Sequence, residues 1–235
     1  MSSYWLIGCF LLLVCNTGAL GGTSRRLQLR VLRHQPCTKG TPSERIRFPP
    51  IEDAPFEPDP DRGDGCYRIK GTVRVLHAIS GEVQLYVETK YGTKTPAEEC
   101  KGADENNCGG IGSCVYCNVC DGIKELGKSA VQLAIGDKAF DCKNGLAPRN
   151  YTDIQISFCM PTKKEFLKSQ NIDEEFWNRY GASGQMVFLT LYIFNKPINT
   201  LSRDELHKLA KADSEQVIGC HKLVGSVSEP RRSYD

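Results

Sequence analysis

Cysteines give this sequence most of its potential for chemistry, since twelve of its 235 residues are cysteines. Cys114, Cys117 and Cys120 follow one another with two residues in each gap. Thiolates at this spacing can bind zinc or an iron–sulfur cluster. In an oxidising compartment the same thiols form disulfides instead. The chemistry of the cysteines therefore depends on where the chain goes.

Residues 1–20 have the composition of a signal peptide. The apolar stretch from Trp5 to Cys15 is about as long as a signal-peptide core and too short to span a bilayer. Small residues follow it, so we expect cleavage within 18–22, although the positive residues that usually precede the core are missing. A retained anchor or a buried core segment is the alternative.

Removal of this segment takes away Cys9 and Cys15, so ten of the twelve cysteines remain. An even number of cysteines in an exported chain predicts five disulfides and no bound metal. The sequon Asn150-Tyr151-Thr152 agrees with export, because glycans are added to asparagine only in the secretory route. We expect a secreted or lysosomal glycoprotein with all its cysteines paired. These are Cys37, Cys66, Cys100, Cys108, Cys114, Cys117, Cys120, Cys142, Cys159 and Cys220.

Residues suited to catalysis are scarce in the remaining sequence. The four histidines are His34, His77, His207 and His221, and none lies in a zinc-binding helix motif or beside a plausible nucleophile. The sequence contains neither a phosphate-binding loop nor a dinucleotide fingerprint, so we expect no cofactor. Thirty basic and 28 acidic residues give a net charge of +2, too balanced for a general nucleic-acid binder. We expect a protein that is not an enzyme; a secreted hydrolase is the alternative.

The elements that position these residues are predicted to be mainly strands. Apolar and polar residues alternate over 72–75, 83–88 and 154–158, and 216–227 resembles a closing strand. Before them, residues 21–36 are expected to be a flexible basic lead. We predict one β domain over 37–228 and a tail over 229–235.

Helix is expected to be short. Ser202-Arg203-Asp204-Glu205 is a capping box, which predicts a helix that ends at about Ala212. The fold class is therefore mainly β: a disulfide-stapled antiparallel β-cup or sandwich with one or two short helices.

The stretch from Met186 to Phe194 is the most apolar after the signal peptide, and both of its faces are apolar. It predicts a strand that is covered on both sides. Phe176, Trp177 and Tyr180 lie nearby in a segment rich in charge. These aromatic residues suit either core packing or the rim of a lipid cavity, and composition does not separate the two.

Five motifs, taken in order, resemble the ganglioside GM(2) activator-like proteins of the ML lipid-recognition superfamily. The resemblance covers roughly residues 37–228, and its specificity comes from the order and spacing of the motifs together. The motifs are Glu57-Pro58-Asp59-Pro60, Leu85 to Lys90, Ile111-Gly112-Ser113-Cys114 with Cys120-Asp121, Phe158-Cys159-Met160-Pro161 with Lys163 to Phe166, and Ile218 to Lys222.

This resemblance implies a β-cup whose apolar interior takes the acyl chains of a lipid. Such a protein extracts a glycolipid or phospholipid from a membrane and presents it to an enzyme or receptor. It is at most an activator of a lipid hydrolase, and its contact with the membrane is transient. The alternative is a secreted protein-binding or signalling module with a filled core and no lipid.

The resemblance also implies disulfide pairs. They are Cys37–Cys220, Cys100–Cys114 and Cys120–Cys159, with Cys142 paired to Cys66, Cys108 or Cys117. Residues 101–110 are longer than in the family, and the helix over 202–212 is an insertion. Either departure could reshape the mouth of the cavity, so the particular lipid and the downstream partner stay open.

Strand alternation, combined with the implied cup, gives a set of residues for its interior. We expect the cavity to be lined by Leu85, Val87, Ile156, Phe158, Phe188, Leu191 and Ile193.

Overall fold

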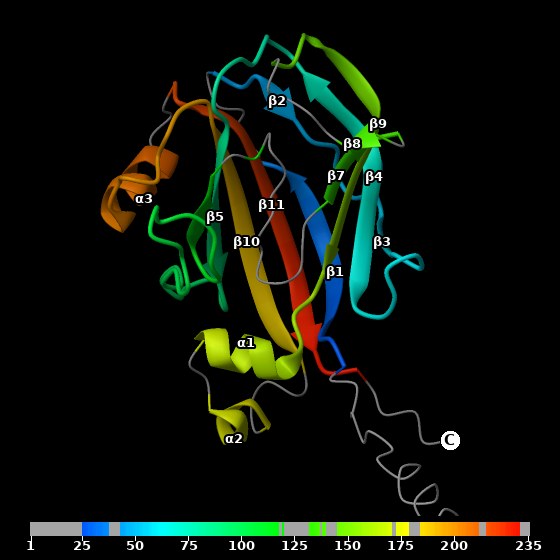
Figure 1. Ribbon diagram of the computed structural model, residues 1–235, viewed down its shortest axis with the longest axis vertical. Coiled ribbons are helices and arrows are strands. Elements are labelled where there is room, and N and C mark those ends of the chain that lie inside the picture. The colour runs from blue at the N-terminus through cyan, green and yellow to red at the C-terminus, as the bar shows by residue number, and fades with distance from the viewer. Residues whose placement is uncertain are drawn as a thin grey trace, which may run out of the picture.

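Two antiparallel β-sheets face each other in the computed structural model (Figure 1). The structure describes residues 25–37, 43–117, 119, 132–136, 138–139, 145–170, 173–178, 184–211 and 215–230. Strands dominate this part of the chain, and disulfides join several of them. The prediction of a mainly β, disulfide-stapled sandwich is confirmed.

The first sheet has the strand order β1, β11, β10, β5, β6. Its strands are β1 (Gln28–Pro36), β11 (Val217–Ser228), β10 (Gln185–Phe194), β5 (Gln84–Lys90) and β6 (Cys114–Tyr116). The second sheet has the order β2, β4, β9, β7, β8, and β3 also pairs with β4. Its strands are β2 (Ile46–Arg47), β3 (Phe56–Pro58), β4 (Cys66–Val75), β7 (Gln132–Ile135), β8 (Lys138–Ala139) and β9 (Arg149–Cys159).

Strand β1 corrects the prediction of a flexible basic lead over 21–36. Residues 28–36 pair with β11, from Gln28 opposite Ser228 to Pro36 opposite His221. The basic side chains of this segment lie on one exposed face, while Leu29 on the other face is buried. A prediction from the charge of the segment does not detect that one face of the strand is basic and exposed while the other is apolar and buried.

The predicted capping box is present and opens α3 (Arg203–Lys211). The backbone N–H and the hydroxyl of Ser202 both donate to Glu205 Oε2, at 2.8 and 2.7 Å. The helix lies on the side of the first sheet that faces away from the second sheet (Figure 1). There Leu206 is buried with Tyr86 and Phe194, so α3 covers part of the outer face of β5 and β10.

A second capping box, which the sequence analysis did not identify, opens α1 (Lys163–Gln170). The backbone N–H and the hydroxyl of Thr162 both donate to Glu165 Oε2 at 2.9 Å. The short helix α2 (Glu174–Phe176) follows. Figure 1 shows both helices at the end of the sheets opposite β2.

Four disulfides join described residues, and two of them are predicted pairs. Cys37–Cys220 links the end of β1 to β11, and Cys100–Cys114 anchors the loop before β6. The other two are Cys66–Cys159 and Cys108–Cys117.

The predicted pair Cys120–Cys159 is wrong in this structure. Cys66 lies directly opposite Cys159 in the register of β4 and β9, and their Cα atoms are 3.9 Å apart. The predicted partner of Cys142 is also wrong, because Cys66, Cys108 and Cys117 are all used in other pairs. Cys120 and Cys142 themselves lie outside the described residues.

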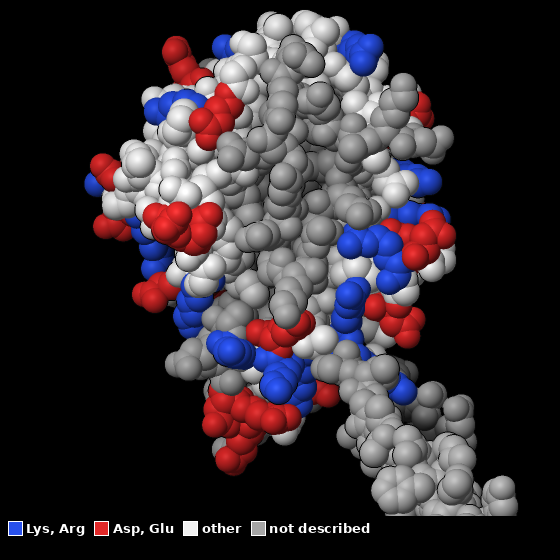
Figure 2. Space-filling view, in the orientation of Figure 1, with Lys and Arg blue, Asp and Glu red and all other residues white. Residues whose placement is uncertain are grey.

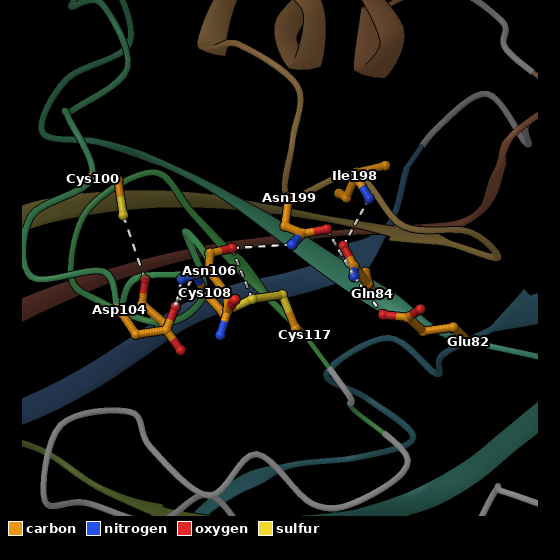
Figure 3. The surroundings of a disulfide bond; sticks show 10 residues. Glu82, Gln84, Cys100, Asp104, Asn106, Cys108, Cys117, Ile198 and Asn199 are labelled. Carbon is orange, nitrogen blue, oxygen red and sulfur yellow. Dashed lines mark hydrogen bonds between the residues drawn. A yellow bond between two sulfur atoms is a disulfide. The ribbon is translucent and has the colours of Figure 1, made fainter.

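The long loop over 101–110 is fastened at several points, two of which are drawn in Figure 3. The Cys108–Cys117 disulfide ties it to the end of β6. The amide of Asn199, in the segment after β10, donates to the carbonyl of Asn106 at 3.0 Å. This loop is therefore packed against the end of the first sheet. Within the described ranges, no helix is long and apolar enough to cross a membrane.

Candidate functional site

The register of the first sheet shows which side chains of β10 point into the sandwich. Leu191 lies opposite Val87 on β5 and His221 on β11. Since successive side chains of a strand alternate between its faces, Leu189, Leu191 and Ile193 share one face. Ile193 packs in a cluster with residues of β4 and β9, so this face points towards the second sheet.

Two buried clusters hold the sheets together, at opposite ends. The β2-end cluster consists of Ile46, Val73, Val75, Ile79, Val83, Leu146, Tyr151, Ile154, Ile193 and Ile218. The α1-end cluster consists of Leu27, Leu29, Phe166, Leu167, Trp177, Val187 and Val227. Figure 1 shows β2 and α1 at opposite ends of the sheets.

An interior band of inward side chains separates these clusters: Ile69, Val87, Ile156, Leu191 and Leu223. All five are only half-buried and none is a buried member of either cluster, but Ile156 packs against the β2-end cluster. On β10, Leu191 follows Leu189, which packs against the α1-end cluster, and precedes Ile193 of the β2-end cluster.

The second sheet contributes Ile69 and Ile156 to the interior band. Ile69 lies opposite Ile156, between Phe158 at the α1 end and Ile154 at the β2 end. Sheets that pack directly on each other bury their inward side chains fully, at the density of an organic crystal. The inward side chains of the interior band are therefore more accessible than those of the two buried clusters.

Most of the predicted lining residues do point inward. Leu85, Val87, Ile156, Phe158 and Leu191 are half-buried on inward faces, and Ile193 is buried in the β2-end cluster.

The assignment of Phe188 to the interior is wrong. Phe188 lies opposite Lys90 and Val224, three residues before Leu191 on the same strand, and so on the outer face. Because both faces of β10 are apolar, hydrophobicity does not distinguish them.

Of the two alternatives left open for Trp177, the structure shows core packing rather than a rim position, because this residue is only 3% exposed. Its ring packs edge-on against Phe166, with 5.5 Å between centroids. Its Nε1–H donates to Glu229 Oε1 at 2.7 Å, and Lys163 Nζ lies 2.9 Å from the same oxygen. Trp177 therefore anchors the helical segment to the end of β11. The Phe176 side chain and Tyr180 lie outside the described residues.

A pair of histidines that the sequence analysis did not connect lies inside the sandwich beside this band. His34 Nδ1 is 3.1 Å from His221 Nε2, and His34 Nε2 is 2.8 Å from the carbonyl oxygen of Ala54. A carbonyl only accepts, so His34 Nε2 carries the proton and His221 Nε2 donates to His34 Nδ1. Burial, reinforced by the His34 ring, lowers the pKa of His221 to about 4.

With a pKa of about 4, His221 carries no charge at neutral pH. His221 Nδ1 is buried and has no hydrogen-bond partner among the described residues. The edge of Phe48 approaches the His221 ring, with centroids 5.9 Å apart. No group of three or more metal-ligating side chains occurs in the part of the chain that the structure describes.

The face drawn in Figure 2 carries basic and acidic side chains interspersed. At the α1–α2 end, Lys163 forms ion pairs with Glu174 and Glu229. Asn150 of the sequon is exposed on β9, and so is Thr152, so both are accessible for glycan addition.

Comparison with protein-family models finds no match for this chain, and comparison with curated proteins finds none either.

Proposed function

We propose that this protein binds the acyl chain of a glycolipid or phospholipid between its two sheets. It extracts the lipid from a membrane and presents it to an enzyme or receptor, without catalysing a reaction itself. The observation that carries this proposal is the interior band, where aliphatic side chains of both sheets stay half-buried between two well-packed ends.

The free-energy cost of taking a lipid out of a membrane calls for an apolar binding site and for no catalytic group. Each methylene taken from water is worth about 0.8 kcal/mol, so exposing a chain of ~16 carbons costs on the order of 12 kcal/mol. Only surroundings about as apolar as the bilayer offset that cost. Ile69, Leu191 and Leu223 offer aliphatic surface of this kind from three strands.

Two further observations support the proposal. The ordered motifs resemble those of the ML lipid-recognition superfamily, whose members are lipid carriers. The four disulfides are compatible with a secreted protein, as a carrier in the extracellular fluid or the lysosome requires.

The test places a larger side chain where the acyl chain is proposed to bind. Leu191→Trp adds a large ring to the interior band, whereas Leu76→Trp makes the same change at a leucine that is 42% exposed. The mature protein is incubated with vesicles that contain a labelled lipid and separated from them, and the lipid that leaves with the protein is measured.

We expect Leu76→Trp to extract lipid like the wild type and Leu191→Trp to extract much less while staying folded. A filled core would instead lose about 1–3 kcal/mol of stability on such overpacking. If the wild type extracts no lipid and Leu191→Trp is destabilised in this way, the protein is the filled-core binding module instead.

A further inference from the structure

A β-bulge in β1 places two consecutive side chains on the outer face of the first sheet. Val31 lies opposite Gly225 and Arg33 opposite Val224, so Leu32 is the extra residue of the bulge. Val31 packs against the α1-end cluster and His34 is buried inside the sandwich, so both point inward. Leu32 and Arg33, between them, are both exposed, and Leu32 is 47% exposed.

The register extends this outward position into a row across four strands. Arg33 lies opposite Val224 on β11, Val224 opposite Phe188 on β10, and Phe188 opposite Lys90 on β5. The row therefore has two apolar side chains at its centre and a cation at each end. Phe188 and Val224 are half-buried and belong to none of the buried clusters of the described residues.

Two more cations lie on the adjacent outward positions. Arg30 is two residues before Leu32 on β1, and Lys222 is two residues before Val224 on β11; both are exposed. We define the docking face as Arg30, Leu32, Arg33, Phe188, Lys222 and Val224.

The charged side chains of the docking face are all basic. Among the described outward residues of β1, β5, β10 and β11, Glu88 is the one acid, and it is buried. Its oxygens lie 2.9 Å from Lys90 Nζ and 3.0 Å from His207 Nδ1, so its charge is already matched. Within the described residues, Arg30, Arg33 and Lys222 form no such ion pair.

We propose that the docking face lies on an anionic membrane surface. Arginine and lysine side chains are attracted to acidic headgroups, and apolar side chains among them can enter the boundary between headgroups and acyl chains. Helix α3 covers the far end of the same sheet face over Tyr86 and Phe194, which leaves the β1–β11 half for this contact. The inference rests on the proposed carrier function and assigns the surface through which the carrier meets its donor membrane.

The test is sedimentation of the mature protein with phosphatidylcholine vesicles, with and without phosphatidylserine, at low and high salt. The docking variant carries Arg30→Gln, Arg33→Gln and Lys222→Gln. The matched control carries Lys70→Gln, Arg74→Gln and Lys164→Gln, which remove the same charge at exposed sites elsewhere.

We expect binding only to phosphatidylserine vesicles, weakened by salt, and weakened roughly a hundredfold in the docking variant. In a separate variant of the wild type, the single change Leu32→Asn should also weaken vesicle binding, but without altering its salt dependence. Equal binding by the docking variant and the wild type overturns the proposal, as does an equal loss in the control variant or absence of binding to acidic vesicles.

A second measurement separates this proposal from the carrier function. A short-chain fluorescent phospholipid, supplied as monomers without vesicles, reports on the interior alone. The docking variant should take it up like the wild type. A wild type that binds acidic vesicles but takes up no monomeric lipid would contradict the carrier function and leave the docking face standing.

Discussion

The imidazole rings of His34 and His221 are hydrogen-bonded to each other inside the sandwich, with 3.1 Å between His34 Nδ1 and His221 Nε2. The two residues are 187 positions apart in the chain, and the pairing of β1 with β11 brings them together. The carbonyl of Ala54 fixes the proton on His34 Nε2, and this fixes the proton on His221 Nε2 in turn. Protonation of His221 would place a charge on this buried ring, which its lowered pKa disfavours.

We predict that this pair makes the protein less stable in acid. The pKa of His221 is about 4 in the folded state, below its ordinary value of 6.5, because the ring is buried. Between these pH values the unfolded chain binds a proton that the folded chain does not, so the free energy of unfolding falls as pH decreases. The loss from this residue totals about 3 kcal/mol. Urea unfolding at a series of pH values measures it.

Two variants isolate the contribution of His221. His221→Gln keeps an N–H donor for His34 but does not titrate, so its stability should change less between pH 6.5 and 4. His77→Gln replaces an exposed histidine and should leave the pH dependence as in the wild type. Equal pH dependence in His221→Gln and the wild type would show that this pair does not contribute.

Below pH 4.5, we predict that protonation of Glu88 contributes to the loss of stability. Burial opposes its charge, but Lys90 and His207 hold the pKa of Glu88 below its ordinary value of 4.5. A lowered carboxyl pKa stabilises the fold above 4.5, and that stabilisation is lost as pH falls through the folded value. Glu88→Gln should therefore reduce stability at neutral pH and flatten its decline below 4.5. If Glu88→Gln unfolds in parallel with the wild type at every pH, the contact with α3 has no such role.

The disulfide pattern predicts which peptides stay linked after digestion without reduction. Cys66 should be found with Cys159, and Cys108 with Cys117. If all ten mature cysteines are paired, Cys120 and Cys142 are the only two left, so they must pair with each other. Mass spectrometry of the linked peptides checks all three pairs. A Cys120–Cys159 peptide would restore the pairing implied by the family resemblance and contradict the structure.

Trp177 should behave as a core residue. Trp177→Ala removes a ring that is 3% exposed, and we expect it to cost about 3–5 kcal/mol in the free energy of unfolding. Glu229→Gln keeps an acceptor for the indole N–H and should cost much less. Denaturant unfolding followed by circular dichroism measures both changes. If Trp177→Ala lowers the free energy of unfolding by less than about 1 kcal/mol, Trp177 is not a core residue and a position at the rim of the cavity is favoured instead.

The sequence was informative wherever the signal was local. Ser202 and Glu205 predicted α3 because a capping box needs only one turn of chain. The same local motif at Thr162 and Glu165 opens α1.

The wrong predictions, and the features that were not predicted, depend on contacts between distant parts of the chain. The Cys66–Cys159 disulfide depends on the register of β4 and β9, which the spacing of cysteines does not contain. Phe188 could not be separated from Leu191, because β10 is apolar on both faces and only its neighbours show which face is inward. In β1 the extra residue Leu32 breaks the alternation on which strand prediction depends.

The central claim is that the interior between the sheets holds a lipid. Native mass spectrometry of the gently purified mature protein, before and after incubation with phospholipid vesicles, tests it most directly. We predict a species heavier than the protein by the mass of one lipid, with its abundance much reduced in Leu191→Trp and unchanged in Leu76→Trp. A spectrum that contains only the lipid-free mass, before and after incubation, would contradict the account.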